Sequence, residues 1–199
     1  MSLLAVQGGA TGSGTVTLLA PVTNTNRTLT LPDVTGTVLS SATTTGFPAG
    51  SVIQVVNSQT GAVATGTTSM PRDDTIPQNT EGNEYMSLAI TPTNINSKLR
   101  IDVVFNYTQS NGTNNSLQLG LFQDSVSNAL AAAQQQITAD FFDQLSLTHY
   151  MTAGTVSATT FKVRAGASST GTLTFNGQSS ARFMGGVMAS SITITEIAT

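Results

Sequence analysis

Residues 98–108 (KLRIDVVFNYT) alternate apolar and polar side chains with a period of two. Every odd position is apolar, and among the five even positions from 98 to 106 only Val104 is apolar. The apolar set is Leu99, Ile101, Val103, Phe105 and Tyr107. This period places the set on one face of a β-strand, an arrangement that no helix would produce. Burial of five such side chains stabilises a fold by up to about 10 kcal/mol, so other strands must cover that face.

Most of the chain from residue 51 onward predicts strands that can cover it. Short apolar or alternating segments are separated by stretches rich in Gly, Asn, Ser and Pro, which favour turns. The predicted strands are 51–57, 84–91, 116–124, 144–152, 159–165, 171–176 and 190–197, and residues 63–68 predict a weaker strand or a loop. Residues 70–83 hold two prolines and most of the local charge, and they predict a long exposed loop. The pattern is typical of an all-β fold, a sandwich of two antiparallel sheets.

Residues 128–145 (NALAAAQQQITADFFDQL) fit two structures. Ala and Gln favour a helix, and Leu130, Ala133, Ile137 and Phe141 fall at helical spacing. A sandwich needs a strand here instead. We expect the strand, because tertiary context often overrides helix propensity.

The first 47 residues predict a separate small module. Residues 1–14 are rich in Gly, Ser and Thr and resemble a flexible arm. Three short strand signals follow, and they are 15–20, 27–31 and 37–40. Three short strands have too few residues to bury a core alone. This module must therefore dock on the rest of the chain, on a partner or on copies of itself. The expected domains are therefore 1–47, an arm with an anchoring β module, and 48–199, a larger head.

Charged residues make up only 9% of the chain, against about 25% in ordinary soluble domains. Thr, Ser, Asn and Gln carry the polarity instead. With few charges to guard strand edges, we expect an obligate oligomer. The net charge of −3 argues against nucleic acid or an anionic membrane as a partner. Residues 1–7 do not resemble a secretory signal and no apolar run approaches about 18 residues, so we expect neither classical export nor membrane insertion.

The residues that carry catalysis are scarce. The chain has no cysteine, which excludes thiol nucleophiles and Cys-based metal sites. Its one histidine, His149, falls in phase with Leu147 and Met151 and predicts a side chain that is packed or lies at an interface. No G-x-S-x-G motif presents a serine nucleophile. The glycine-rich residues 8–15 have Thr15 where a phosphate-binding loop needs lysine, so they are interpreted as part of the arm.

Two groups of carboxylates could be read as sites. Asp140 and Asp143 could form a glycosidase pair, but they flank two phenylalanines and no third polar group is evident to tune them. A looser acidic group could offer oxygen ligands to Ca²⁺ but lacks the spacing of a calcium loop, and its members are Asp73, Asp74, Glu81 and Glu84. We interpret both groups as solvated loop residues. The sequence therefore predicts no catalytic residue, no cofactor and no metal, and a protein that is not an enzyme.

Signals for carbohydrate are also weak. The chain has no Trp, and its phenols are Tyr85, Tyr107 and Tyr150. Four glycosylation sequons are expected by chance in a chain rich in Thr and Asn, and they begin at Asn26, Asn106, Asn111 and Asn114.

A resemblance to a known family adds to these patterns. Residues 14–41, which contain GTVTLLAP and RTLTLPDVTGTVLSS, resemble a repeat-like segment near the start of bacteriophage fibre proteins and other virion surface proteins. Four later segments look like a domain that closes such fibres, namely 48–56 (PAGSVIQVV), 91–103 (TPTNINSKLRIDV), 160–166 (TFKVRAG) and 190–197 (SSITITEI). The resemblance implies a homotrimeric virion protein whose head is a jelly-roll β-sandwich.

The expected function rests on the resemblance and on the undersized first module. We expect a structural protein of a bacteriophage virion surface, a capsid decoration (cement) or short head-fibre protein anchored to capsid or tail proteins through residues 1–47. It would assemble in the bacterial cytoplasm of the host. The alternative is a tail-fibre tip whose loops 70–83 and 178–186 recognise a host surface polysaccharide.

Overall fold

The structure is a computed structural model that describes residues 47–110 and 115–199. It also describes five isolated, exposed residues near the start of the chain, which are Thr11, Ser13, Asn24, Asn26 and Thr28. The chain divides into two units, Met1–Thr37 and Val38–Thr199. The strands predicted at 15–20, 27–31 and 37–40 lie outside the described residues. Every strand that the structure describes belongs to the second unit.

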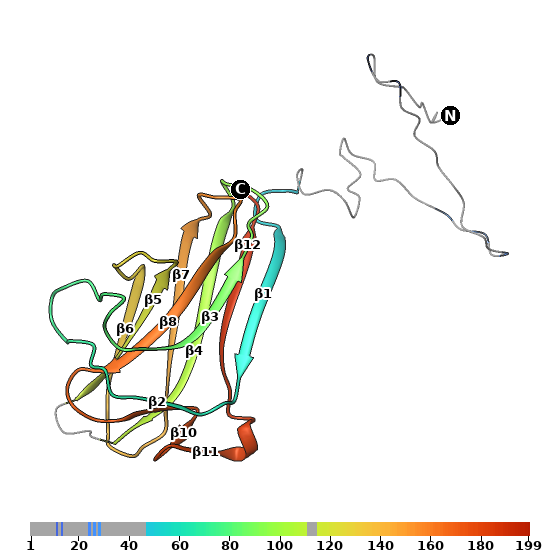
Figure 1. The fold of residues 1–199 in the computed structure, drawn as a ribbon. Helices are drawn as coiled ribbons and strands as arrows, with labels where there is room; N and C mark the ends of the chain where they lie inside the picture. Colours follow the sequence, from blue (N-terminus) through green and yellow to red (C-terminus); the bar gives the residue numbers. More distant parts are fainter. Residues whose placement is uncertain are drawn as a thin grey trace. The chain divides into compact units, whose positions relative to one another are not determined.

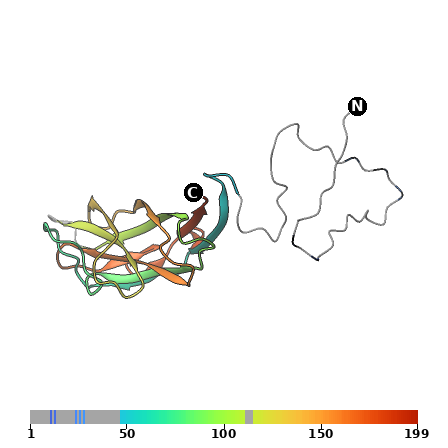
Figure 2. The same ribbon diagram turned by 90° about the horizontal axis from the view of Figure 1, so that it is seen from above.

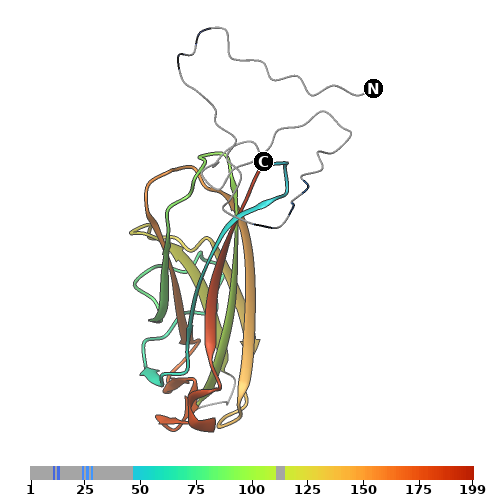
Figure 3. The ribbon, with the colours of Figure 1, turned by 90° about the vertical axis from the view of Figure 1, so that its right-hand side faces the viewer.

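The second unit is built from two antiparallel sheets (Figure 1). The first sheet has the order β1, β12, β4, β7, with bounds Val52–Thr60, Ser190–Ile197, Lys98–Gln109 and Asp143–Thr152. The second sheet has the order β3, β8, β5, β6, with bounds Asn83–Ile90, Thr159–Ala167, Ser116–Gln123 and Ala131–Gln136. Figures 2 and 3 show the sheets as two facing layers.

The pairing of the strands is that of a jelly roll. The outermost strands of the chain pair, β1 with β12, and successive pairs nest inside them: β3 with β8, β4 with β7, and β5 with β6. Eight strands wrapped in this way into two sheets define the jelly-roll sandwich. The predicted all-β fold class is confirmed.

Smaller elements extend the first sheet. β9 (Leu173–Phe175) pairs with the last residues of β4, and β2 (Ala64–Gly66) pairs with β9. A short hairpin of β10 (Gly177–Gln178) and β11 (Ala181–Arg182) precedes a single 3₁₀ turn, η1 (Met184–Gly186). Among the described residues no helix is long and apolar enough to cross a bilayer.

The alternation in β4 builds the core as predicted. Its five apolar side chains point between the sheets and are at most 2% exposed. On the opposite face Lys98 and Arg100 are exposed, but Asn106 and Thr108 are buried. The segment that precedes β12 covers both of them, because Asn106 donates to the carbonyl of Ala189 (2.8 Å) and Thr108 donates to that of Gly177 (2.8 Å). The outer face of β4 is therefore open over only part of its length.

Residues 128–145 form strands, and the helical alternative is wrong. β6 pairs with β5 from Ala131 to Gln136, a turn follows, and β7 begins at Asp143. The pairing with β5 overrides the helix propensity of Ala and Gln.

The two ends of the sandwich differ. At the end that we call proximal, the amide of Gly50 donates to Ala198 and the amide of Ala198 donates to Ser51 (2.8 Å each). The far end, which we call distal, is made by residues 61–63, 137–142 and 168–189 (Figure 1).

A buried carboxylate organises the proximal end. Glu196 accepts hydrogen bonds from Gln54 Nε2 (2.6 Å), from the amide and hydroxyl of Thr93 (2.9 Å each), and from the amide of Asn94 (3.2 Å). Burial alone would raise the pKa of Glu196, but these hydrogen bonds outweigh it and lower the pKa below its usual value. This inward carboxylate is therefore fully satisfied by four donors.

Two adjacent valines in β4 test which face is buried. We expect Val103→Ala to lower the free energy of unfolding by about 2 kcal/mol, because it removes buried methyl groups and leaves a cavity. The matched control Val104→Ala, on the outer face, should cost less than about 1 kcal/mol. Urea denaturation of both variants measures the difference, and equal losses would contradict the assigned orientation of β4.

Candidate functional site at the distal end

The distal end is made of tightly turned loops. Among the described residues, six that are not glycine have a positive φ, and five of the six lie at this end: Asp140, Asn176, Ser179, Ser180 and Met184. Such backbone is uncommon outside glycine and concentrates at functional sites. The distal loops are therefore the first place to look for binding.

Large apolar side chains are exposed among these loops. Phe141 is 68% exposed, and Phe142 packs its ring edge-on against Phe183 with centroids 4.8 Å apart. Met184 and Val187 are more exposed than Phe142. The loops thus present aromatic and apolar groups to solvent.

An aromatic hollow of about 210 Å³ lies between the ends of the two sheets. It is lined by Tyr107, Ile137, Thr138, Phe141, Phe142 and Asp143. Asp143 is the first residue of β7 and pairs with Tyr107 across the first sheet. Its carboxylate accepts a hydrogen bond from Gln135 Nε2 and one from the amide of Gln144 (2.9 Å).

The interior next to this hollow holds unpartnered polar atoms. The hydroxyl of Tyr107 and both side-chain polar atoms of Gln109 are buried and have no hydrogen-bond partner among the described residues. Burial, and then the charge of Asp143, raise the pKa of the Tyr107 hydroxyl well above its usual value. Buried polar groups are normally paired, so these atoms mark an unusual interior.

A second hollow of about 210 Å³, which we call the hydroxyl hollow, is lined in part by the same turn between β6 and β7, residues 137–142. Its lining is Thr108, Ser110, Asp140, Thr172, Thr174, Ser179 and Ser180. The backbone of Asp140 is held by Gln109 and by the side chain of Gln178 (2.9 and 2.5 Å), and its carboxylate has no partner among the described residues. Asp140 and Asp143 thus line different hollows, which gives no support to a shared glycosidase pair.

Residues 67–82, which we call the strap, cross the outer face of the second sheet. The amide of Met70 donates to Ala167 (3.0 Å), and the Met70 side chain is fully buried. A Cβ atom added at Gly166 would lie 2.6 Å from the carbonyl oxygen of Thr68, so this close approach requires glycine. The predicted loop 70–83 exists, but the expectation that it is exposed throughout is wrong at Met70 and Gly82, which are both buried.

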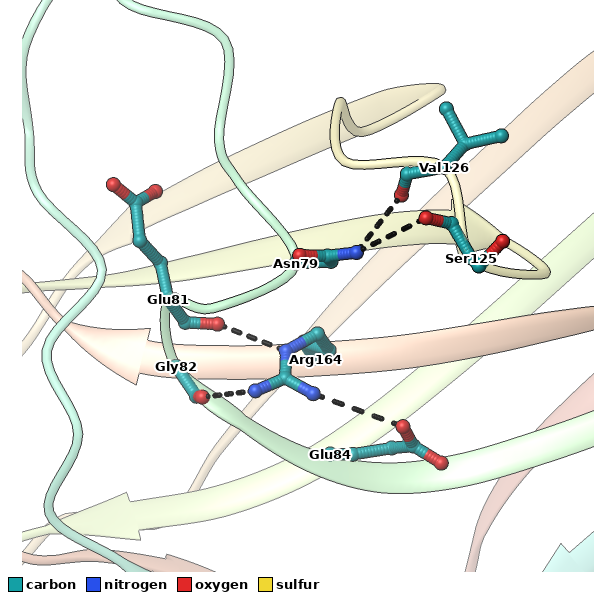
Figure 4. A network of polar contacts seen from close by, with 7 residues as sticks. All are labelled: Asn79, Glu81, Gly82, Glu84, Ser125, Val126 and Arg164. Atoms are coloured by element: carbon teal, nitrogen blue, oxygen red, sulfur yellow. Dashed lines mark hydrogen bonds and ion pairs between the residues drawn. The ribbon is translucent and has the colours of Figure 1, made fainter.

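Arg164 fastens the strap to β8 (Figure 4). Its guanidinium donates to the carbonyls of Glu81 (3.0 Å) and Gly82 (2.7 Å) and lies 3.7 Å from the Glu84 carboxylate. In the same network, Asn79 Nδ2 donates to the carbonyls of Ser125 and Val126. The strap is therefore tied both to β8 and to the loop after β5.

The predicted acidic group is dispersed over this network. The Asp73 carboxylate accepts hydrogen bonds from the hydroxyl and the amide of Thr75. These hydrogen bonds lower the pKa of the Asp73 carboxyl. Glu81 accepts from the amide of Gln78, and Glu84 faces Arg164. In the part of the chain that the structure describes, no group of three His, Asp or Glu side chains could hold a metal ion.

His149 faces the interior in phase with Leu147 and Met151, as predicted, and pairs with Ile101. Partial burial lowers the pKa of its imidazole. Tyr150 points the other way and lies under the guanidinium of Arg100, 5.9 Å from the ring centre.

The remaining candidates fall in three places. The side chains of Tyr85 and Tyr107 are in the core, where each hydroxyl is buried. Asn106 is buried and hydrogen-bonded, so its sequon is not accessible. Asn111, Asn114 and most of the glycine-rich residues 8–15 lie outside the described residues.

Sequence reasoning missed the roles of Phe141, Phe142 and Arg164. A signal existed for the first two, because adjacent phenylalanines at the start of an alternating strand cannot both face the core. No sequence signal marks Arg164, whose partners are backbone carbonyls of a distant segment.

No protein-family model matches this chain, and no curated protein matches it in sequence. Solved structures with a similar arrangement include the Eiger TNF of S. frugiperda, at 9% identity and a TM-score of 0.40, with 72% of this chain and 93% of that one covered. VP2 in a subviral particle of infectious bursal disease virus is another, at 11% identity and a TM-score of 0.36. That match covers 83% of this chain and 42% of the VP2 chain.

The xylan-binding CBM22-1 domain of Paenibacillus barcinonensis Xyn10C matches at 13% identity and a TM-score of 0.33. That match covers 76% of this chain and 97% of the domain. Viral capsid and TNF-like proteins are thus among the structural neighbours. At these scores the likeness says nothing about what this chain binds.

Arg164 and Lys162 offer a test of the strap, because both project from the same face of β8. We expect Arg164→Gln to speed trypsin cleavage after the exposed Arg72 about tenfold, since it removes hydrogen bonds from a charged donor worth about 1.5–3 kcal/mol. Lys162→Gln should leave the rate unchanged. Mass spectrometry of timed digests measures both, and equal rates would show that Arg164 does not hold the strap.

Proposed function

We propose that this chain is a non-enzymatic structural protein of a bacteriophage virion surface, with a homotrimeric jelly-roll head. A capsid decoration or short head-fibre role fits best, with residues 1–47 as the anchor to the capsid or tail. The bacteriophage origin rests on the motif resemblance of residues 14–41 and of the later segments.

The observation that carries the structural role is the outer face of the first sheet. Its side chains are mostly Ser, Thr, Asn and Gln, and its charges are limited to Lys98 and the Arg100–Asp102 ion pair (2.9 Å). Val55 and Tyr150, both more than half exposed, project from strands of the same sheet. A broad face with so little charge is suited to cover by another copy of the chain.

The second sheet offers no equivalent surface. The strap crosses its outer face and buries Met70 there, and Phe122 is also buried. The strap covers part of the outer face of the second sheet. On the first sheet, the described residues cover the outer face only around Asn106 and Thr108, which supports association through that sheet.

Sedimentation tests the trimer. We expect the full chain at micromolar concentration to sediment at about three times 20.5 kDa. Thr193→Lys should give a 20.5 kDa species, because the new ammonium next to Asp102 would have to lose its water when another copy covers this face. Ser87→Glu, opposite Lys162 on the second sheet, is the control and should stay trimeric. A folded wild-type monomer would end the trimer proposal.

Removal of the first module tests the anchor. All described strands of the sandwich lie between Val52 and Ile197, so a chain lacking residues 1–46 should keep a cooperative unfolding transition. We expect it to lose co-sedimentation with virions that lack the native protein, whereas the full chain is retained. A truncated head that still binds the particles would show that the anchor lies elsewhere.

A further inference from the structure

The aromatic hollow holds an inward carboxylate that forms no ion pair among the described residues. Asp143 is in phase with Leu145 and Leu147 of β7, so it continues the core-facing side of that strand to the distal mouth. Among the described residues the ion pairs are Arg100 with Asp102 and Arg164 with Glu84, and neither includes Asp143. A charged group at the edge of an apolar core is expected to have a partner of opposite charge.

A comparison with Glu196 shows what is missing. Glu196, the inward carboxylate of the proximal end, accepts from four donors. Asp143 accepts from two, Gln135 and the amide of Gln144. An ionised carboxylate has about four acceptor positions, so Asp143 keeps room for further donors.

The walls of the hollow define the shape of what can enter. Phe141 and Phe142 form an aromatic rim, Ile137 adds an apolar surface, and the volume is about 210 Å³. Drug-sized ligands occupy roughly 300–1,000 Å³, so the hollow suits one small group or the end of a chain. Aromatic faces attract cations as well as alkyl groups.

Tyr107 belongs to the same lining, and its hydroxyl is an interior group that a ligand in the hollow does not reach. Its hydroxyl is buried and has no partner among the described residues, although buried hydroxyls usually have one. Burial, and then the charge of Asp143, raise the pKa of this hydroxyl, so the carboxylate acts on the interior next to the hollow.

We propose that the aromatic hollow binds a protonated alkylamine. The ammonium would donate to the free acceptor positions of Asp143, and its alkyl stem would lie between Phe141 and Phe142. An ammonium offers three donors and the positive charge that the site lacks. This inference is independent of the trimer and of the virion role.

A neutral sugar is the less favoured occupant of this hollow. It would leave the charge of Asp143 without a counter-ion, whereas hydroxyl groups are better matched by the hydroxyl hollow around Asp140. The two hollows share one turn but differ in lining, which gives the experiment a matched control.

The test is an NMR titration of the full-length chain with butylammonium, which copies the end of a lysine side chain, and with 1-butanol as its neutral counterpart. We expect butylammonium to shift the amides of residues 137–144 in a saturable way, and binding to weaken as salt is raised. Butanol should bind at least tenfold more weakly. Equal binding of the two probes, or amide shifts centred elsewhere, would overturn the proposal.

Variants assign the contacts. Asp143→Asn should weaken butylammonium binding at least tenfold, and Asp140→Asn, in the other hollow, should change it less than twofold. Phe141 is exposed, so Phe141→Ala should fold normally and still weaken binding at least threefold. Undiminished binding in both Asp143→Asn and Phe141→Ala would overturn the assignment.

Further arms identify the source of the amine. A short lysine-containing peptide that binds at least tenfold more tightly than butylammonium would indicate a lysine of a partner polypeptide, and tighter binding of spermidine would indicate a free polyamine. Either result supports the binding of a protonated amine in this hollow. Saturable binding of a neutral hexose in this hollow, without any of butylammonium, would replace the proposal with a sugar site.

Discussion

The alternation of β4 is the constraint on which the rest of the sandwich depends. This strand is hydrogen-bonded on both sides, to β12 and β7 along most of its length and to β9 at its end. Its inward side chains meet the second sheet, so a shift of one residue in either pairing would expose the whole apolar set. The nested strand pairs of the jelly roll then result, because each neighbour of β4 must itself be covered.

The same alternation creates the candidate site. The inward positions of β4 run from Leu99 to Tyr107 and then Gln109, and those of β7 run back from Met151 to Asp143. Both strands thus end in polar groups on the core side at the distal mouth. The interior is apolar at its centre and polar where it opens. The aromatic hollow is therefore a continuation of the core rather than an addition to it.

The eight main strands and the class of fold could be predicted from the sequence because they depend on periods of two within single segments. The strand at β6 required one further step, since only its pairing with β5 excludes the helix that Ala and Gln favour. The burial of Met70 could not be predicted, because it depends on Gly166 of a strand almost a hundred residues later. For the same reason, the short spacing of Asp140 and Asp143 suggests a pair that the structure does not form. Spacing along the chain does not give the direction of side chains in a turn with positive φ.

Each sheet has one edge strand without charge. β1 (VIQVVNSQT) and β6 (AAAQQQ) are edge strands that contain no charged residue. They therefore lack the charges that usually protect an edge strand against pairing with another chain. β3 and β8 carry Glu84, Lys162 and Arg164, and there the charges of Arg164 and Glu84 hold the strap. The open face of the first sheet also carries charges, namely Lys98 and the Arg100–Asp102 ion pair, but most of its side chains are hydroxyls and amides, which cost less to desolvate than ions. The proposed association of copies through the first sheet rests on this excess of neutral groups.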